Sequence, residues 1–167
     1  MKRPVRVVVY EDLQCPDSAA YRAMLEEKLL PAYGSAAVFE QRDFPLGKHD
    51  WARKAAIAAR FFQEIDPAVG SGFRSYALRN LREITAENFT EKLFSFSRRH
   101  GIDPALAVAA LDEEKYAGPV EADYQEGIAR GVSRTPTVFV NAERFVEKFA
   151  FEDIAKAIDT ALAALKH

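Results

Sequence analysis

Two short apolar runs with a helical stretch between them constrain the fold of this chain most. Residues 5–10 read VRVVVY and residues 37–44 read AVFEQRDF, and both runs have the length and the β-branched or aromatic content of strands. From residue 19, apolar side chains recur at helical spacing as far as Leu29, before Pro31 and Gly34 are expected to end the helix. This order predicts a βαβ unit with a right-handed crossover, its first strand buried in a parallel sheet.

The middle of the chain has the pattern of several helices. Apolar residues recur at helical spacing from Trp51 to Phe62, and Thr85 is placed to cap a later helix. We expect the glycines within 70–72 to interrupt the helical pattern, and the Gly-Pro pair at 118–119 to interrupt it again. The middle block is therefore expected to be all-helical.

The last third of the chain predicts two strands and a helix. Residues 137–140 and 144–146 have strand character with a turn at 141–142, and residues 151–165 carry one apolar helical stripe. The full order is βαβ, a helical block, then ββα. The chain is accordingly expected to be one α/β domain over residues 1–167, with a helical insertion at approximately 48–117.

Composition and the first residues give no support for several kinds of partner and site. The formal net charge is −2, which supports neither nucleic acid nor an anionic membrane surface as a partner. One cysteine and three scattered histidines do not predict a metal site. The first residues, MKRPVRVVVYEDL, lack the features of a signal peptide, so a cytoplasmic location is expected, or export if a signal has been left out.

The single cysteine, Cys15, is the first candidate for a functional residue. It lies in DLQCPDS, where the first strand gives way to a helix, and Pro16 suits the first helical turn. Unpaired N–H groups and the helix dipole at such a position favour a thiolate, whereas nearby carboxylates such as Asp17 oppose it. A buried cysteine that acts only as a small apolar residue is the alternative that remains open.

The second candidate is the tripeptide Thr135-Pro136-Thr137, directly before a predicted strand. A proline that enters a sheet cannot donate a ladder hydrogen bond, so it marks a strand start, an edge or a cis peptide bond. The tripeptide alone does not distinguish these alternatives.

The chain resembles the DsbA-like thioredoxin-fold oxidoreductases, in the same order and over nearly its whole length. The resemblance rests on three segments, VVVYEDLQCPDS, QRDFPLGKHDWARKAAIAARFF and GVSRTPTVFVN. The resemblance implies a thioredoxin fold with a helical insertion. It also implies a cis Thr135–Pro136 bond packed beside Cys15, with Cys15 as the attacking thiol of a thiol–disulfide oxidoreductase. Pro16, Asp17, Arg134 and Thr135 are the implied substrate-binding positions. Arg134 either turns toward Cys15 or extends into solvent.

The chain departs from the family pattern at Ser18. The redox motif of the family is Cys-x-x-Cys, whereas this chain has Cys15-Pro16-Asp17-Ser18, and a hydroxyl cannot form a disulfide. Cys15 is thus expected to form a mixed disulfide that only an external thiol releases. No bound cofactor is expected, and glutathione is one candidate for that thiol. Ser18 is either a natural feature or an engineered cysteine-to-serine change, and the sequence leaves both open.

A second departure is Val9. Many relatives carry a buried acid near this strand position, and here the residue is apolar. Glu11 is close in sequence and is expected on the opposite face from Tyr10. His49 follows the DFPLGK segment, where a surface position near a helix start is the favoured interpretation over a place in a groove.

Three functions are consistent with the sequence. The preferred one is a DsbA-like enzyme acting on protein or small-molecule thiols and disulfides. The first alternative is an enzyme similar to kappa-class glutathione transferases and related isomerases, which hold glutathione at this turn. The second is a thioredoxin-like peptide-binding module without catalysis. The oligomeric state and the direction of the redox reaction do not follow from the sequence.

Overall fold

The centre of the protein is a four-stranded mixed sheet. The computed structural model describes residues 3–167. The order of its strands is β2-β1-β3-β4, where β1 runs parallel to β2 and antiparallel to β3, which is antiparallel to β4. The expectation of a parallel sheet therefore holds only for one neighbour of β1. The strands are β1 (Val5–Glu11), β2 (Ala37–Asp43), β3 (Thr137–Val140) and β4 (Glu143–Val146).

Helical segments account for most of the remaining chain. No helix within residues 3–167 has the length and apolar character needed to cross a membrane. The helical segments are α1 (Pro16–Met24), the π-helical turn η1 (Leu25–Leu29), α2 (Leu30–Tyr33), α3 (Ala52–Ile65), α4 (Pro67–Arg79), α5 (Phe89–Arg99), α6 (Pro104–Ala110), α7 (Glu114–Ala129) and α8 (Phe151–Ala164).

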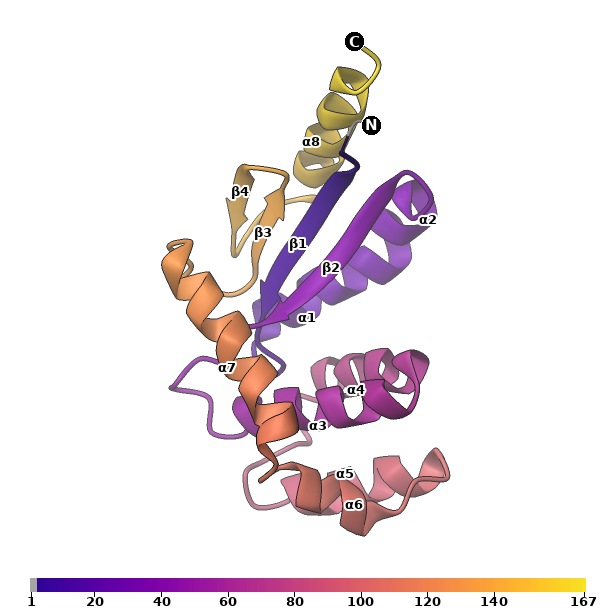
Figure 1. Cartoon of the computed structure of the whole chain (residues 1–167), viewed down its shortest axis with the longest axis vertical. Helices are drawn as coiled ribbons and strands as arrows, with labels where there is room; N and C mark the ends of the chain where they lie inside the picture. The colour runs from indigo at the N-terminus through magenta and orange to yellow at the C-terminus, as the bar shows by residue number, and fades with distance from the viewer. Residues whose placement is uncertain (1–2) are drawn as a thin grey trace.

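The two faces of the sheet are covered differently. Behind the sheet in Figure 1, α1, η1 and α8 bury a continuous apolar face that includes Val7, Val9 and Val138. On the other face, α7 covers only the end near Tyr10 and Phe44, so the apolar cluster there is small. Side chains alternate between the two faces along each strand, so one face of the sheet is fully packed and the other is partly open.

Helices α3 to α6 lie between β2 and α7 in the chain and form a second packed body beyond the ends of β1 and β2 (Figure 1). Their aromatic side chains build its core, with Phe62 in contact with both Phe73 and Phe96 at ring-centroid distances of 5.1 and 5.0 Å. The thioredoxin fold with an all-helical insertion is confirmed, because βαβ and ββα units share one sheet and every element between α3 and α7 is helical.

A buried ionic cluster joins the sheet to this helical body. The carboxylate of Asp43, at the end of β2, accepts hydrogen bonds from Arg74 of α4 at 2.6 Å and from Arg60 of α3 at 2.8 Å. Arg60 also contacts Asp123 of α7. Burial alone would raise the pKa of Asp43, but Arg74 and Arg60 outweigh it and lower that pKa below 3.8. Asp43 is therefore held as a carboxylate between two helices.

Two predicted interruptions of the helical pattern are wrong. Residues 70–72 lie inside α4, where a Cβ at Gly70 would meet the Cα of Gln63 at 2.7 Å, so glycine lets α3 and α4 approach closely. Pro119 lies inside α7, and its buried neighbours Tyr116 and Val120 pack on the helical body. Tertiary packing overrides local propensity in both segments.

The cap expected at Thr85 is also misplaced. Helix α5 begins four residues later, at Phe89, and Thr85 instead exchanges hydrogen bonds with Asn88. The two bonds join the backbone N–H of each residue to the side-chain oxygen of the other, at 2.7 and 3.1 Å. They stabilise a separate turn before the helix, because short polar side chains compete for backbone partners.

Candidate active site

Cys15 occupies the first turn between β1 and α1. It is the N-cap residue of α1, and Pro16 follows at the first helical position. The Cys15 carbonyl accepts a hydrogen bond from Ala19 N at 3.0 Å, and its N–H donates to the Asp12 carbonyl at 3.1 Å. This geometry places the thiol at the end of the helix where backbone N–H groups are unpaired, as the sequence predicts.

The thiol of Cys15 lies against the loop before β3. Its Sγ donates to the carbonyl oxygen of Thr135 at 3.4 Å, across 120 residues of sequence, and the Thr135–Pro136 bond is cis. Both features agree with what the family resemblance implies. Cys15 is 7% exposed, so only one side of the residue is open to solvent.

That open side faces a surface hollow of about 680 Å³. Pro16, Asp17, Arg134 and Thr135 all line it together with Cys15. Pro136 is absent from this lining, and its carbonyl accepts a hydrogen bond from Glu147 N at 2.8 Å, which fixes the loop to the end of β4. The remaining lining residues are Leu46, Gly47, Lys48, His49, Ser133 and Glu147.

Ser18 lies in the first turn of α1 and is not among the residues that line the hollow. It is fully buried, and its Oγ accepts a hydrogen bond from the backbone N–H of Asp12 at 3.2 Å. The hydroxyl therefore supports the turn that carries Cys15, while the thiol faces the opening.

The Arg134 side chain extends into solvent. It is 68% exposed, and its guanidinium forms an ion pair with Glu147 at 3.6 Å. Of the two orientations that the sequence left open, the structure adopts the solvated one at the rim of the hollow.

The sequence-based interpretation underrated His49. His49 lines the hollow that Cys15 faces, and its Nδ1 is 2.8 Å from Oδ2 of the fully buried Asp12. The same carboxylate accepts hydrogen bonds from Gln14 N and Leu46 N, both at 2.7 Å. Asp12 thus connects the cysteine turn to the loop after β2. The only sequence signal was that Asp12 and His49 both follow the carboxyl ends of predicted strands.

A buried acid exists near the apolar Val9, two residues further along β1. Glu11 is 1% exposed, both carboxylate oxygens lack a hydrogen bond, and Arg74 lies 3.7 Å away. Burial raises the pKa of Glu11 above its ordinary 4.5, against the opposing charges of Arg22 and Arg74. Burial without a hydrogen-bond partner therefore disfavours the charged form of Glu11.

These features define a class of protein. A cysteine that caps the helix after a central strand, contacted by a cis-proline loop that enters the neighbouring antiparallel strand, is the site arrangement of a thioredoxin fold. A family sequence model described as thioredoxin (Thioredoxin_4) matches residues 1–160. The chain belongs to this thioredoxin family.

Several solved structures with the same fold carry the name DsbA. Oxidised BdbD from Bacillus subtilis is 22% identical, with a TM-score of 0.83 over 96% of this chain and 88% of that one. Alpha-DsbA1 from Wolbachia pipientis is 15% identical, with a TM-score of 0.83 over 98% and 88%. The oxidoreductase DsbA from Xylella fastidiosa is 19% identical, with a TM-score of 0.73 over 98% and 87%.

At these identities the likeness establishes the DsbA-like thioredoxin fold. A comparison with curated protein sequences finds no match to this chain. Among residues 3–167, no group of three or more histidine, cysteine or acidic side chains is arranged to hold a metal ion.

Proposed function

We propose that the protein is a monothiol thiol–disulfide oxidoreductase that works through Cys15. The observation that carries the proposal is the placement of the Cys15 thiol at the start of α1, against the Thr135 carbonyl and facing an open hollow. An N-terminal helix position favours the thiolate, which is the reactive form in disulfide exchange. Membership of the thioredoxin family supports the same chemistry.

The first step forms a mixed disulfide. The Cys15 thiolate attacks one sulfur of a substrate disulfide, forms a new S–S bond to it and breaks the original S–S bond. The displaced sulfur leaves as a thiolate and takes a proton from water.

The second step needs a thiol from outside the chain. Cys15 is the only cysteine, and the residue in the resolving position is Ser18. An external thiol such as glutathione, as its thiolate, attacks the substrate sulfur of the mixed disulfide and regenerates the Cys15 thiolate. The net reaction exchanges one thiol for another on the substrate sulfur, with no net change in the redox state of the protein.

His49 is the residue we assign to deprotonating the external thiol. The bond from Nδ1 to Asp12 fixes the ring, and within the described residues its Nε2 has no hydrogen-bond partner. Neutral imidazole with one nitrogen bonded to a carboxylate is oriented to accept a proton on the other nitrogen. Because His49 and Cys15 line the same hollow, a thiol that enters to attack the mixed disulfide passes the ring.

The test of the mechanism uses oxidised glutathione and intact-protein mass. The wild-type chain is expected to gain one glutathione, and Cys15→Ala none. Added reduced glutathione should then restore the unmodified mass. A wild-type chain that gains no glutathione under these conditions contradicts the proposal. Glutathione conjugation to an electrophile without disulfide exchange would support the transferase alternative instead.

The role of His49 is measured by the rate of that release. His49→Gln is expected to slow release by reduced glutathione by about tenfold or more, because it removes the proton acceptor. Asp112→Asn, on an exposed residue outside the hollow, is the control and should leave the rate unchanged. Equal rates in His49→Gln and wild type would remove His49 from the mechanism.

A further inference from the structure

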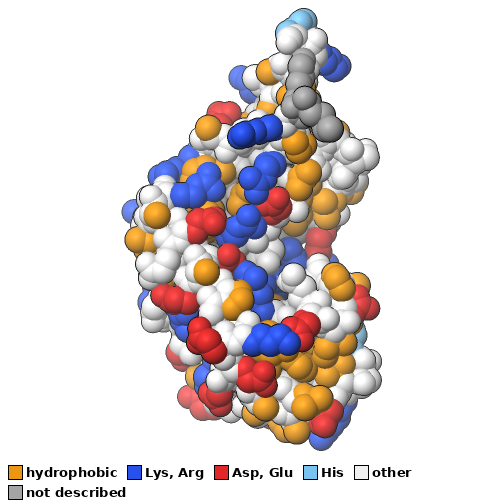
Figure 2. All heavy atoms as spheres, in the orientation of Figure 1, with side chains coloured by type: hydrophobic (Ala, Val, Ile, Leu, Met, Phe, Trp, Pro, Cys, Tyr) orange, Lys and Arg blue, Asp and Glu red, His pale blue; other side chains and the backbone are white. Residues whose placement is uncertain are grey.

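A second hollow lies on the partly open face of the sheet, away from Cys15. Side chains of Arg6 and Val8 on β1 point to this face, and Arg42 on β2 joins them, whereas α7 covers only the end near Tyr10. Figure 2 shows that blue lysine and arginine side chains gather over the upper half of this face. Cys15 follows the opposite end of β1 and lines a different hollow.

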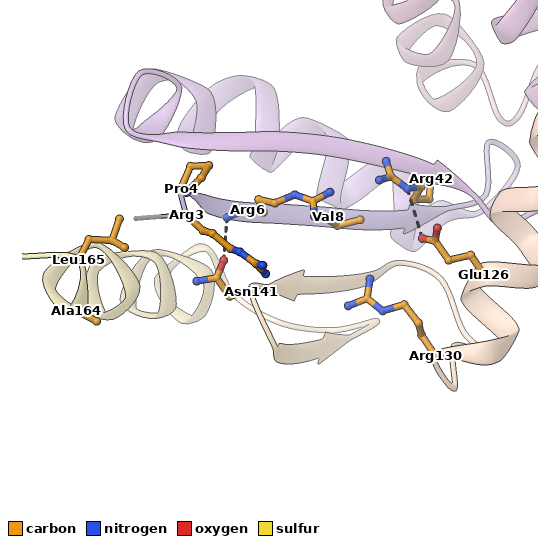
Figure 3. A pocket seen from close by; sticks show the side chains of 10 residues that line it. All are labelled: Arg3, Pro4, Arg6, Val8, Arg42, Glu126, Arg130, Asn141, Ala164 and Leu165. Carbon is orange, nitrogen blue, oxygen red and sulfur yellow. Dashed lines mark hydrogen bonds and ion pairs between the residues drawn. The ribbon is translucent and has the colours of Figure 1, made fainter. Parts of the chain in front are cut away.

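The hollow has a volume of about 830 Å³ and a cationic lining. Four arginines and a single glutamate supply its charges, although the whole chain has a formal net charge of −2. Figure 3 shows these arginines around the hollow from β1, β2, the end of α7 and the segment before β1. The lining consists of Arg3, Pro4, Arg6, Val8, Arg42, Glu126, Arg130, Asn141, Ala164 and Leu165.

Two of the arginines are held in place before any ligand binds. The guanidinium of Arg130 lies 3.8 Å from the ring centroid of Phe139, and its Nη1 donates to Tyr10 Oη at 3.2 Å. Arg42 is held between Glu40, at 2.9 Å, and Glu126, at 3.5 Å. Rings and carboxylates therefore pre-orient the guanidinium groups, which reduces the entropy lost when a ligand binds.

The positive charge of this face is only partly neutralised. Arg6 and Arg42 share the carboxylate of Glu40, and Glu126 also accepts from the Tyr10 hydroxyl. Within residues 3–167, Arg130 forms no ion pair, since its contacts are the Phe139 ring, the Tyr10 hydroxyl and the Tyr10 ring. Planar guanidinium forks suit phosphate oxygens, which they bind in pairs.

An uncharged wall completes the hollow. Val8, Pro4 and Ala164 present apolar surface beside the arginines. Asn141 uses its Oδ1 to accept from Arg6 N at 2.9 Å, which leaves its side-chain NH₂ group as a donor toward the ligand. A ligand that fits has several anionic oxygens and also an apolar part, because Val8 lies between Arg6 and Arg42 in the lining (Figure 3).

We propose that this hollow binds an organic phosphate, with its phosphate groups on Arg6, Arg42 and Arg130 and its body against Val8 and Pro4. The concave shape favours a small molecule. An extended polyanion such as nucleic acid needs a basic surface that continues beyond the hollow, and a chain with a sequence pI near 6.0 offers little overall charge for that purpose. The proposal does not depend on the redox role of Cys15.

Isothermal titration calorimetry of the full chain tests this site with ADP as the probe. ADP is expected to bind, and inorganic pyrophosphate and adenosine to bind at least about tenfold more weakly, since each lacks one half of the ligand. Arg6→Gln should weaken ADP binding by about tenfold through loss of a charge-assisted hydrogen bond. Circular dichroism verifies that each variant is folded.

Arg53→Gln is the matched control. Arg53 is 47% exposed and pairs with Glu121 at 2.9 Å. Arg6 is similar, because it is 50% exposed and pairs with Glu40 at 2.5 Å. The difference is that Arg53 lies outside the hollow. Unchanged ADP binding in this variant supports the site. Absence of ADP binding to the wild-type chain, or an equal loss in both variants, overturns the proposal.

A vesicle experiment distinguishes a free phosphate from a lipid headgroup. Wild-type protein is expected not to co-sediment with phosphatidylglycerol vesicles. Co-sedimentation that Arg6→Gln abolishes would overturn the small-molecule assignment in favour of a lipid headgroup.

Discussion

Oδ2 of Asp12 and Nδ1 of His49 lie 2.8 Å apart, although 37 residues separate them in the sequence. The contact joins the turn that carries Cys15 to the loop after β2, and both sides of it border the hollow that the thiol faces. The arrangement of the candidate active site therefore depends on one fully buried carboxylate.

Asp12→Asn is predicted to destabilise this junction. The amide that replaces the carboxylate retains at most one acceptor oxygen for the N–H groups of Gln14 and Leu46 and the ring of His49. We expect a loss of about 1–3 kcal/mol in the free energy of unfolding, measured by chemical denaturation. Asp112→Asn, on an exposed residue far from this network in the chain, is expected to change it by less than about 0.5 kcal/mol. Similar effects of the two changes would contradict the role given to Asp12.

Ser18→Cys is predicted to convert the site to a dithiol. The change restores the Cys-x-x-Cys pattern across the first turn of α1, where the two side chains are three residues apart. After treatment with oxidised glutathione, the variant should show an internal disulfide in place of the mixed disulfide. Intact mass and thiol titration report the difference. A stable glutathione adduct on the variant would show that the side chain at residue 18 does not reach Cys15.

Asp43→Asn is predicted to weaken the contact between the helical body and the sheet, and so to destabilise the fold. The substitution removes the carboxylate that Arg74, which is 2% exposed, contacts at 2.6 Å, and leaves the more distant Glu11 at 3.7 Å. Breaking such a buried pair costs about 3–5 kcal/mol, to be measured by urea denaturation. The surface pair of Lys115 and Glu64 provides the control, because Glu64→Gln should cost less than about 1 kcal/mol. A small effect of Asp43→Asn would mean that Arg74 finds other partners.

Glu11→Gln is predicted to alter how stability depends on pH. The pKa of Glu11 is raised in the folded state, so the folded chain binds the proton more tightly than the unfolded chain does. Its contribution to stability is therefore complete below pH 4.5 and declines as pH rises through the folded-state pKa. Between the unfolded-state and folded-state pKa values, each pH unit lowers the contribution of Glu11 to the free energy of unfolding by about 1.4 kcal/mol.

Glutamine does not titrate, so the stability of the variant should not show the decline with pH that Glu11 causes. Relative to wild type, the variant should therefore become more stable as pH rises from 4 to 8. Denaturation midpoints across that range measure the effect, and Glu87→Gln on the surface is the control. Parallel pH profiles of Glu11→Gln and wild type would contradict a raised pKa of Glu11 in the folded state.

Much of the fold follows from local sequence. β1 and β2 were predictable because their β-branched and aromatic runs are short and bounded by turn residues, and α8 because its apolar stripe is regular. The breaks expected around Gly70 and Pro119 were wrong, because glycine and proline propensities are weak compared with the packing of whole helices.

The sequence by itself determined the thioredoxin order of elements and the position of Cys15 at a strand-to-helix turn, since both depend on residue types within a few positions of one another. Only the tertiary structure decided that Asp12 holds His49 at the hollow of the thiol, that Arg134 faces solvent, and that arginines from four segments gather on one face of the sheet. These relationships join residues far apart in the chain, and local patterns carry no information about which distant side chains meet.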